Sequence, residues 1–296
     1  MHARHTPSSR HKGRLRAVLA LSASFMVVQI AVGWWTNSLA LLADAAHLFV
    51  DAAGVGLSLL AVWFAERPAT AEKTYGYYRV EILAALVNGV VLCVLALAIL
   101  VEAWERLRVR HEISAGPVLV VAVAALGVNL LAARLLHAGA GESLNVRSAY
   151  LEVLGDALSS GAVIAAAAVI LVTGWTAADA LASAAIGLLI LPRTYALLKQ
   201  AVNVLLEGVP AHLDLTEIEA ALRGARGVKR VHDLHVWTLT SGREAMSAHV
   251  EVEPGTPPSR ILDELHVVLH ARFGIDHTTI QIENEAPALL QITPRA

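Results

Sequence analysis

Six long apolar stretches constrain the fold of this chain more than any other feature. Each has about 20 residues or more, the length that an α-helix needs to cross the hydrocarbon core of a bilayer. They lie at residues 15–35, 39–64, 80–104, 117–136, 149–172 and 177–198. Only 16% of all residues are charged, whereas a soluble domain has roughly 25%. The sequence therefore predicts an α-helical membrane protein with six transmembrane helices in a lipid bilayer.

The distribution of Lys and Arg predicts the orientation of these helices. Basic residues cluster before the first stretch and in every second loop, whereas the alternate loops contain only Arg106, Arg108 and Arg110. Because basic loops stay in the cytoplasm, we expect both termini to be cytoplasmic. The first stretch is too long for the apolar part of a cleaved signal peptide, so we expect it to remain in the protein.

The charge content becomes normal after the sixth stretch. Helical patterns at 215–226 and 258–273 alternate with strand patterns at 228–240, 244–253 and 278–283. This order predicts a small α+β domain, αββαβ. The predicted organisation is a cytoplasmic tail (1–14), a six-helix transmembrane domain (15–200), a linker (201–209), a cytoplasmic domain (210–285) and a C-terminal tail (286–296).

Composition excludes two classes of function. The formal net charge of −2 excludes a strongly basic protein that binds nucleic acid. Cys93 is the single cysteine, which excludes a disulfide scaffold and a thiolate zinc cage. Metal chemistry in this chain must therefore use His, Asp and Glu.

Ionisable residues inside the apolar stretches are the strongest functional signal. Such residues are costly in a membrane and usually functional. Asp44, His47 and Asp51 share one helical face, and Glu152 and Asp156 share another, because residues three or four apart lie on the same side of a helix. His47, Asp51, Glu152 and Asp156 together offer one imidazole and three carboxylates, which is a four-ligand set for a divalent cation. Such a set holds either a metal ion or protons.

Other polar residues in the stretches have simpler interpretations. Gln29, Asn88 and Asn129 are expected to hydrogen-bond between helices. Two interpretations of Asp44 stay open: it is hydrated in an exit path, or it caps the start of a helix.

Four motifs carry a family resemblance. They are SLALLADAAHLFVD at 38–51, TYGYYRVE at 74–81, LEVLGDALSS at 151–160 and LLEGVP at 205–210. Their order resembles the cation diffusion facilitator family, particularly its bacterial cobalt–zinc–cadmium resistance branch, over about residues 16–283. The family's transport-site positions fall on His47, Asp51, Glu152 and Asp156.

The resemblance also implies a fold and a function. It implies six transmembrane helices, a cytoplasmic ferredoxin-like domain and a homodimer formed through both domains in the bacterial inner membrane. The implied activity is export of zinc, cadmium or cobalt from the cytoplasm in exchange for protons. The metal is then a transported substrate and also a ligand of the cytoplasmic domain, and no cofactor is expected.

The chain departs from the family pattern at two places. Glu152 stands where the family usually has His, which makes the ligand set harder and more anionic. The loop 139–147 lacks the His-rich run of many zinc-transporting relatives. Two interpretations of His2, His5 and His11 stay open: they collect metal, or they belong to a solvated tail.

The cytoplasmic domain contains a second candidate metal site. A turn at residues 241–242 would place His235 roughly opposite His249, and the alternation of the last strand points Glu283 the same way. We predict a site formed by His235, His249 and Glu283; the alternative is that these are solvated surface residues. His232 is the nearest other contender.

We expect alternating access to carry metal through the membrane site, so the chain is not expected to be an enzyme. An intramembrane metalloenzyme is the main alternative, although no His-Glu-x-x-His pattern supports it. A proton symporter of organic substrates is a third alternative, and it would need no metal ligands.

Overall fold

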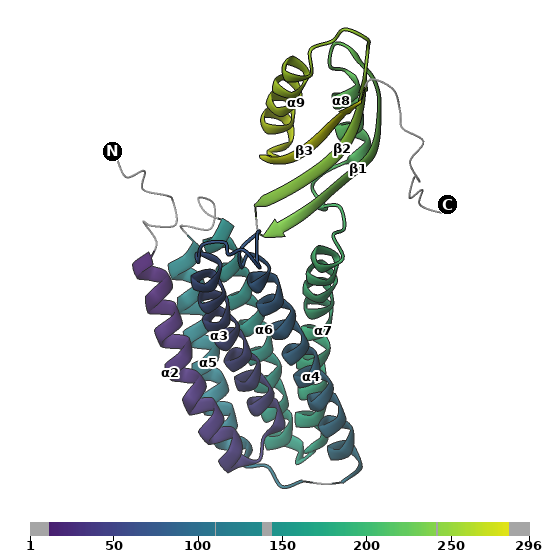
Figure 1. Cartoon of the computed structure of the whole chain (residues 1–296). Helices are drawn as coiled ribbons and strands as arrows, with labels where there is room; N and C mark the ends of the chain where they lie inside the picture. The colour runs from purple at the N-terminus through teal and green to yellow at the C-terminus, as the bar shows by residue number, and fades with distance from the viewer. Residues whose placement is uncertain (1–11, 110, 138–143, 241, 284–296) are drawn as a thin grey trace. The chain divides into compact units, whose positions relative to one another are not determined.

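Six long helices and a small α/β domain make up the described part of the fold. The computed structural model describes residues 12–109, 111–137, 144–240 and 242–283 (Figure 1). The helices of the membrane part are α2 (Lys12–Thr36), α3 (Leu39–Ala65), α4 (Arg79–Arg108), α5 (Ala115–His137), α6 (Leu144–Thr173) and α7 (Ala177–Leu205). They lie close to the predicted apolar stretches, and α7 continues through Pro192 as far as Leu205.

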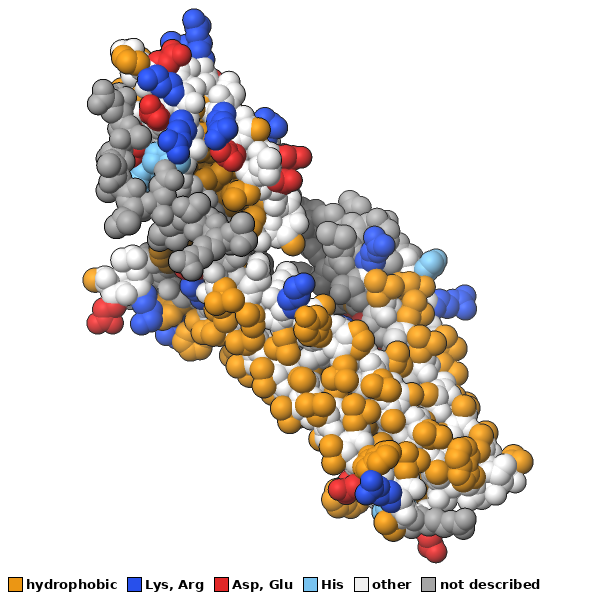
Figure 2. All heavy atoms as spheres, turned by 90° about the vertical axis from the view of Figure 1, so that its right-hand side faces the viewer, with side chains coloured by type: hydrophobic (Ala, Val, Ile, Leu, Met, Phe, Trp, Pro, Cys, Tyr) orange, Lys and Arg blue, Asp and Glu red, His pale blue; other side chains and the backbone are white. Residues whose placement is uncertain are grey.

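Five of these helices are long and apolar enough to cross a membrane, namely α3 to α7. The apolar part of α2, Ala20–Thr36, is shorter. Figure 2 shows apolar side chains over the visible surface of these helices, with charged side chains gathered on the α/β domain and near the helix ends. Large apolar side chains as exposed as Val172 (85%) and Leu158 (70%) would be unfavourable in water. The chain is a multi-pass membrane protein, and the sixth span stays a prediction.

Small residues let the helices pack closely. Much of the buried core between α3 and α7 is alanine, including Ala40, Ala96, Ala122 and Ala167. Gly54 of α3 faces the Asn88 side chain of α4, and a Cβ at this glycine would lie 2.6 Å from it. Asn129 of α5 donates a 3.2 Å hydrogen bond to Ser160 of α6, which confirms its predicted interhelical role.

The start of α3 is capped from α7. The Asp179 carboxylate accepts hydrogen bonds from the backbone amides of Leu39 (2.7 Å) and Ala40 (3.3 Å), and the Ser38 hydroxyl donates to the same carboxylate. These bonds satisfy amides that a helix start leaves unpaired. Asp44 lies inside α3, so the interpretation that it caps a helix start is wrong.

The α/β domain confirms the predicted order αββαβ. Its elements are α8 (Leu215–Arg223), β1 (Val228–Thr240), β2 (Arg243–Val252), α9 (Pro258–Phe273) and β3 (His277–Glu283). The sheet order is β1-β2-β3, with β1 antiparallel and β3 parallel to β2. Residues of α8 and α9 pack with alternate residues of β2, such as Met246 and Val250, in one core. His249 alternates with these residues and therefore lies on the opposite face of the sheet.

The pairing of β1 with β2 is irregular. His232 pairs with His249 and His235 with Ser247, so three steps along β1 match two along β2. Asp233 lies in this bulge with φ 51°, a left-handed conformation that Asp tolerates better than most residues. Two further shifts lie between Val228 and Arg230 and between Thr238 and Thr240, the latter next to the turn. These irregularities decide which histidines meet.

The chain divides into two compact units. The first comprises residues 1–57 and 87–196, and the second comprises residues 58–86 and 197–296. Each unit contains one candidate metal centre.

Candidate metal centres

The first centre lies in the first unit, among α3, α6 and α7. His47, Asp51 and Glu152 line a cavity of about 240 Å³, together with residues of α4, α6 and α7. Asp156 is 5% exposed and interacts electrostatically with Asp51 and Glu152. The structure thus brings together His47, Asp51, Glu152 and Asp156, which we call the membrane tetrad. Helical spacing explains each pair, and packing of α3 near α6 joins the two pairs.

The membrane tetrad is open and only partly hydrogen-bonded. Nδ1 of His47 and Oδ2 of Asp51 are buried without a hydrogen-bond partner among the described residues. Nε2 of His47 lies 3.4 Å from Oδ2 of Asp51, but the two atoms do not form a hydrogen bond. In the described part of the chain, the tetrad does not bring three ligand atoms within 4.8 Å of one another. Buried polar atoms without partners are costly, so they favour a ligand that completes them.

Asp44 belongs to a neighbouring pair. It is 2% exposed, and its carboxylate accepts a 2.6 Å hydrogen bond from Gln29 of α2, which is 1% exposed. The predicted interhelical role of Gln29 is therefore confirmed. The remaining oxygens of both side chains have no hydrogen-bond partner among the residues described. Asp44 also interacts electrostatically with Asp156, which places it next to the tetrad.

Arg193 of α7 also lies at this centre, although the sequence does not predict it there. One of its guanidinium nitrogens, Nη2, lies 3.6 Å from Oε2 of Glu152, and the residue lines the same cavity. A basic residue near the end of an apolar stretch usually indicates the membrane interface, so the sequence alone gave no reason to connect it with a carboxylate on another helix.

The second centre lies on the sheet of the α/β domain. His232, His249 and Glu283 each offer a ligand atom, and these atoms lie within 4.8 Å of one another. Glu283 accepts from His232 at 3.0 Å and from His249 at 2.8 Å. We call these three residues the histidine cluster. They come from β1, β2 and β3, one from each strand.

The predicted role of His235 does not match this geometry. His249 and Glu283 come together as predicted, but His232 takes the place expected for His235 because of the bulge at Asp233. His235 is exposed and contacts the Asp233 carboxylate at 3.0 Å. No sequence signal marks a left-handed Asp inside a strand. His2, His5 and His11 and the loop residues 139–143 lie outside the described residues.

The electrostatics of Glu283 suit a metal ligand. Burial acts to raise the pKa of this carboxyl group, but hydrogen bonds from His232, His249 and Gln281 outweigh burial and lower its pKa below the ordinary value. The carboxylate is therefore held in the charged form that binds cations. Its side chain is 4% exposed, so the negative charge is also shielded from water.

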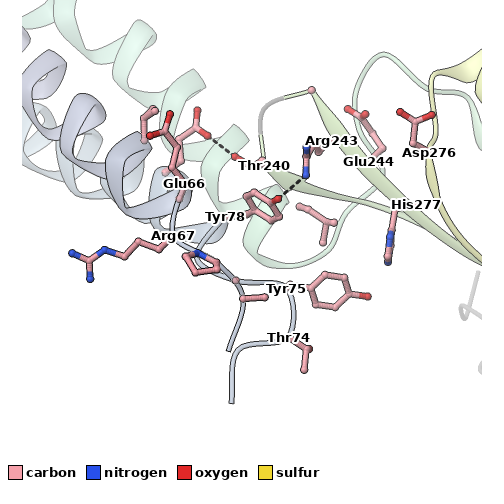
Figure 3. Close-up of a pocket in the computed structure, with 18 of the residues that line it drawn as sticks. Glu66, Arg67, Thr74, Tyr75, Tyr78, Thr240, Arg243, Glu244, Asp276 and His277 are labelled. Atoms are coloured by element: carbon pink, nitrogen blue, oxygen red, sulfur yellow. Dashed lines mark hydrogen bonds between the residues drawn. The ribbon is translucent and has the colours of Figure 1, made fainter. Parts of the chain in front are cut away.

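A larger cavity, of about 800 Å³, lies in the second unit between residues 62–81 and the strand ends near residues 240 and 277 (Figure 3). Several of its polar groups already have partners. Arg243 donates to the Tyr78 hydroxyl at 2.6 Å, Thr240 donates to Glu81, and the Tyr75 ring packs edge-on against His277. Glu66, Glu244 and Asp276 also line it, but the only described ligand trio is the histidine cluster. This cavity is not a preformed metal site.

Comparison with known proteins decides the family. The cation efflux transmembrane domain matches residues 15–206, and the cytoplasmic domain of cation efflux proteins matches residues 210–285. The chain belongs to the cation efflux family. Members of this family are transporters and not enzymes, so the alternative of an intramembrane metalloenzyme is wrong.

Three relatives resemble this cation efflux protein over almost its full length. The metal cation efflux system protein CzcD of Cupriavidus metallidurans is 44% identical over 95% of this chain and 89% of its own length. The zinc transporter ZitB of Escherichia coli is 41% identical, with 94% and 90% covered. The cadmium, cobalt and zinc/H(+)-K(+) antiporter of Bacillus subtilis is 37% identical, with 94% and 92% covered.

Proposed function

We propose that this cation efflux protein is an antiporter that exports zinc, cadmium or cobalt from the cytoplasm in exchange for protons. The observation that carries the proposal is the meeting of three carboxylates and one imidazole from two helices beside a cavity in an apolar bundle. Zinc, cadmium and cobalt appear in the names of its relatives, one of which is an antiporter of metal against H⁺ and K⁺. The membrane tetrad is the transport site of this proposal.

The open geometry of the tetrad supports alternating access. His47 and Asp51 move with α3, whereas Glu152 and Asp156 move with α6. A small displacement of one helix against the other closes the four ligands around a cation or separates them again. Protons compete for the same carboxylates and release the metal at the outer side, since a carboxylate binds either a proton or the metal.

The proposed topology has six transmembrane helices with both termini in the cytoplasm of a bacterium, in its inner membrane. The excess of Lys and Arg in the loops assigned to the cytoplasm supports this orientation. We retain 15–200 and 210–285 as the proposed domains, with a ferredoxin-like cytoplasmic domain. The match to the family's dimerisation domain supports a homodimer.

The histidine cluster is proposed as a second, regulatory metal site. Two imidazoles and a carboxylate form a suitable set for zinc, with a fourth position left for water or another residue. Its ligands lie on strands of the domain that follows the last helix, so we place it outside the transport path. His232 replaces His235 in this proposal.

Metal-driven proton movement in proteoliposomes tests the proposal. Purified protein is reconstituted with a pH dye inside, and zinc, cadmium or cobalt is added with potassium either present or replaced by choline. We expect metal uptake and proton release to occur together, in potassium or choline alike. Zinc flux without proton movement would overturn proton coupling, and zinc flux that requires potassium would assign the exchange to that ion instead.

A further inference from the structure

Arg193 is the only described residue of the membrane cavity that carries a fixed positive charge. It interacts electrostatically with His47, Asp51 and Asp156, and it pairs with Glu152. One cation thus acts electrostatically on all three carboxylates of the tetrad, and it lies within 4 Å of one of them, Glu152. In an apolar bundle this charge strongly repels any second cation that enters.

The pairing of Arg193 with Glu152 is loose. The distance of 3.6 Å is longer than a hydrogen bond, and the Arg193 side chain is 60% exposed whereas Glu152 is 32% exposed. Pro192 precedes Arg193 and has no amide hydrogen, so the α7 backbone lacks one helical hydrogen bond at this point. A long, partly exposed side chain can leave its partner without breaking a packed core.

We propose that Arg193 is a tethered counter-cation of the transport site. Its guanidinium neutralises Glu152 while the site holds no metal, and an entering divalent ion displaces it from this carboxylate. Arg193 therefore competes with the metal and weakens its binding, which favours release of the metal. This inference rests on the proposed function of the membrane tetrad.

The alternative roles of Arg193 make different predictions. An arginine that only ties α6 to α7 would stabilise the fold without lowering metal affinity. An arginine that contacts lipid phosphate would act through the lipid composition. Metal binding becomes tighter on removal of Arg193 only if the arginine competes with the metal.

The test measures equilibrium zinc binding and zinc flux for full-length protein in the background His232→Ala/His249→Ala, which removes the histidine cluster. We expect Arg193→Gln to bind zinc about two- to fivefold tighter, which corresponds to the strength of a partly exposed ion pair. The KM for zinc falls by a similar factor, and the maximal flux also falls because release slows. Arg193→Lys keeps the charge and restores most of the wild-type affinity. The control Lys199→Gln removes a charge from the same helix and leaves the zinc affinity and the KM for zinc unchanged.

Unchanged or weaker zinc binding by Arg193→Gln would overturn the inference. A second comparison guards against misfolding. Arg193→Met is introduced once with Glu152 present and once in the background Glu152→Gln. The change in zinc affinity must be smaller in the Glu152→Gln background. An equal change in both backgrounds would also overturn it. If Asp51→Ala still binds zinc like the wild type, the proposed transport site itself is wrong, which is a separate result.

Discussion

The two candidate metal centres of this protein are built on opposite plans. The membrane tetrad has three carboxylates, one imidazole and a nearby arginine, and buried atoms of His47 and Asp51 have no hydrogen-bond partner among the described residues. The histidine cluster has two imidazoles and one carboxylate, already joined by hydrogen bonds of 2.8 and 3.0 Å. The first is open and the second is preformed.

This difference suits two different tasks. A transport site must bind and release its ion in every cycle, so loosely placed ligands on separate helices are an advantage. A site on a three-stranded sheet has ligands whose positions are fixed by backbone pairing. Such a site can hold a bound metal ion for a long time, and its hydrogen-bonded ligands are also stable without metal.

Removing a tetrad carboxylate should have the largest effect. Asp51→Ala and Asp156→Ala are each expected to reduce zinc flux in proteoliposomes to below about one hundredth of wild type, since losing an outer-sphere partner alone costs about 10–100-fold. Asn129→Ala removes the buried hydrogen bond to Ser160 without touching a ligand, and it serves as the matched control. If either aspartate variant transports zinc normally while remaining folded, the tetrad is not the transport site.

Removing the histidine cluster should affect binding more than transport. In full-length protein that carries Asp51→Ala to disable the tetrad, His232→Ala/His249→Ala is expected to weaken zinc binding on the order of tenfold or more. Flux, measured without the Asp51 change, should fall only partly. His235→Ala is the control and should bind zinc like its parent. If His235→Ala weakened zinc binding more than His232→Ala/His249→Ala did, the bulged register would not be the one that binds metal.

Changing the hardness of the membrane site should alter its selectivity. Glu152→His exchanges a carboxylate for an imidazole, which favours zinc over harder cations, and it introduces the residue that the family resemblance implies at this position. We expect the ratio of zinc to cobalt flux at fixed pH to rise about threefold or more, a difference of roughly 0.7 kcal/mol. A ratio equal to that of wild type would place residue 152 outside the coordination sphere, and Asp44 would be the next residue to test.

Replacing Asp233 in the bulge should have the smallest effect, which is on the stability of the α/β domain. Asp233→Val puts a β-branched residue at φ 51° and is expected to lower the free energy of unfolding by about 1–2 kcal/mol. Asp233→Gly tolerates this φ and should keep the register. Thermal unfolding in the presence of a chelator, followed by zinc titration, compares the two variants. Equal stability of both would mean that the left-handed conformation does not hold the register.

Most features that depend on a single helix or strand follow from local sequence patterns. The apolar stretches predict every helix end to within about five residues except the end of α7, which runs on to Leu205. The spacing of four residues places His47 with Asp51 and Glu152 with Asp156 on shared faces. The order αββαβ followed in the same way from the alternation of apolar and polar residues. These patterns are local, because the helix and strand repeats fix where each side chain lies around its own axis.

Which elements meet depends instead on tertiary packing. Arg193 reaches Glu152 because α7 packs beside α6, and Gln29 reaches Asp44 because α2 packs beside α3. His232 replaces His235 in the cluster because one residue in a left-handed conformation shifts the pairing of β1 with β2. Contacts between helices and the position of a bulge depend on the packing of residues far apart in the chain, so no repeat within a single segment determines them.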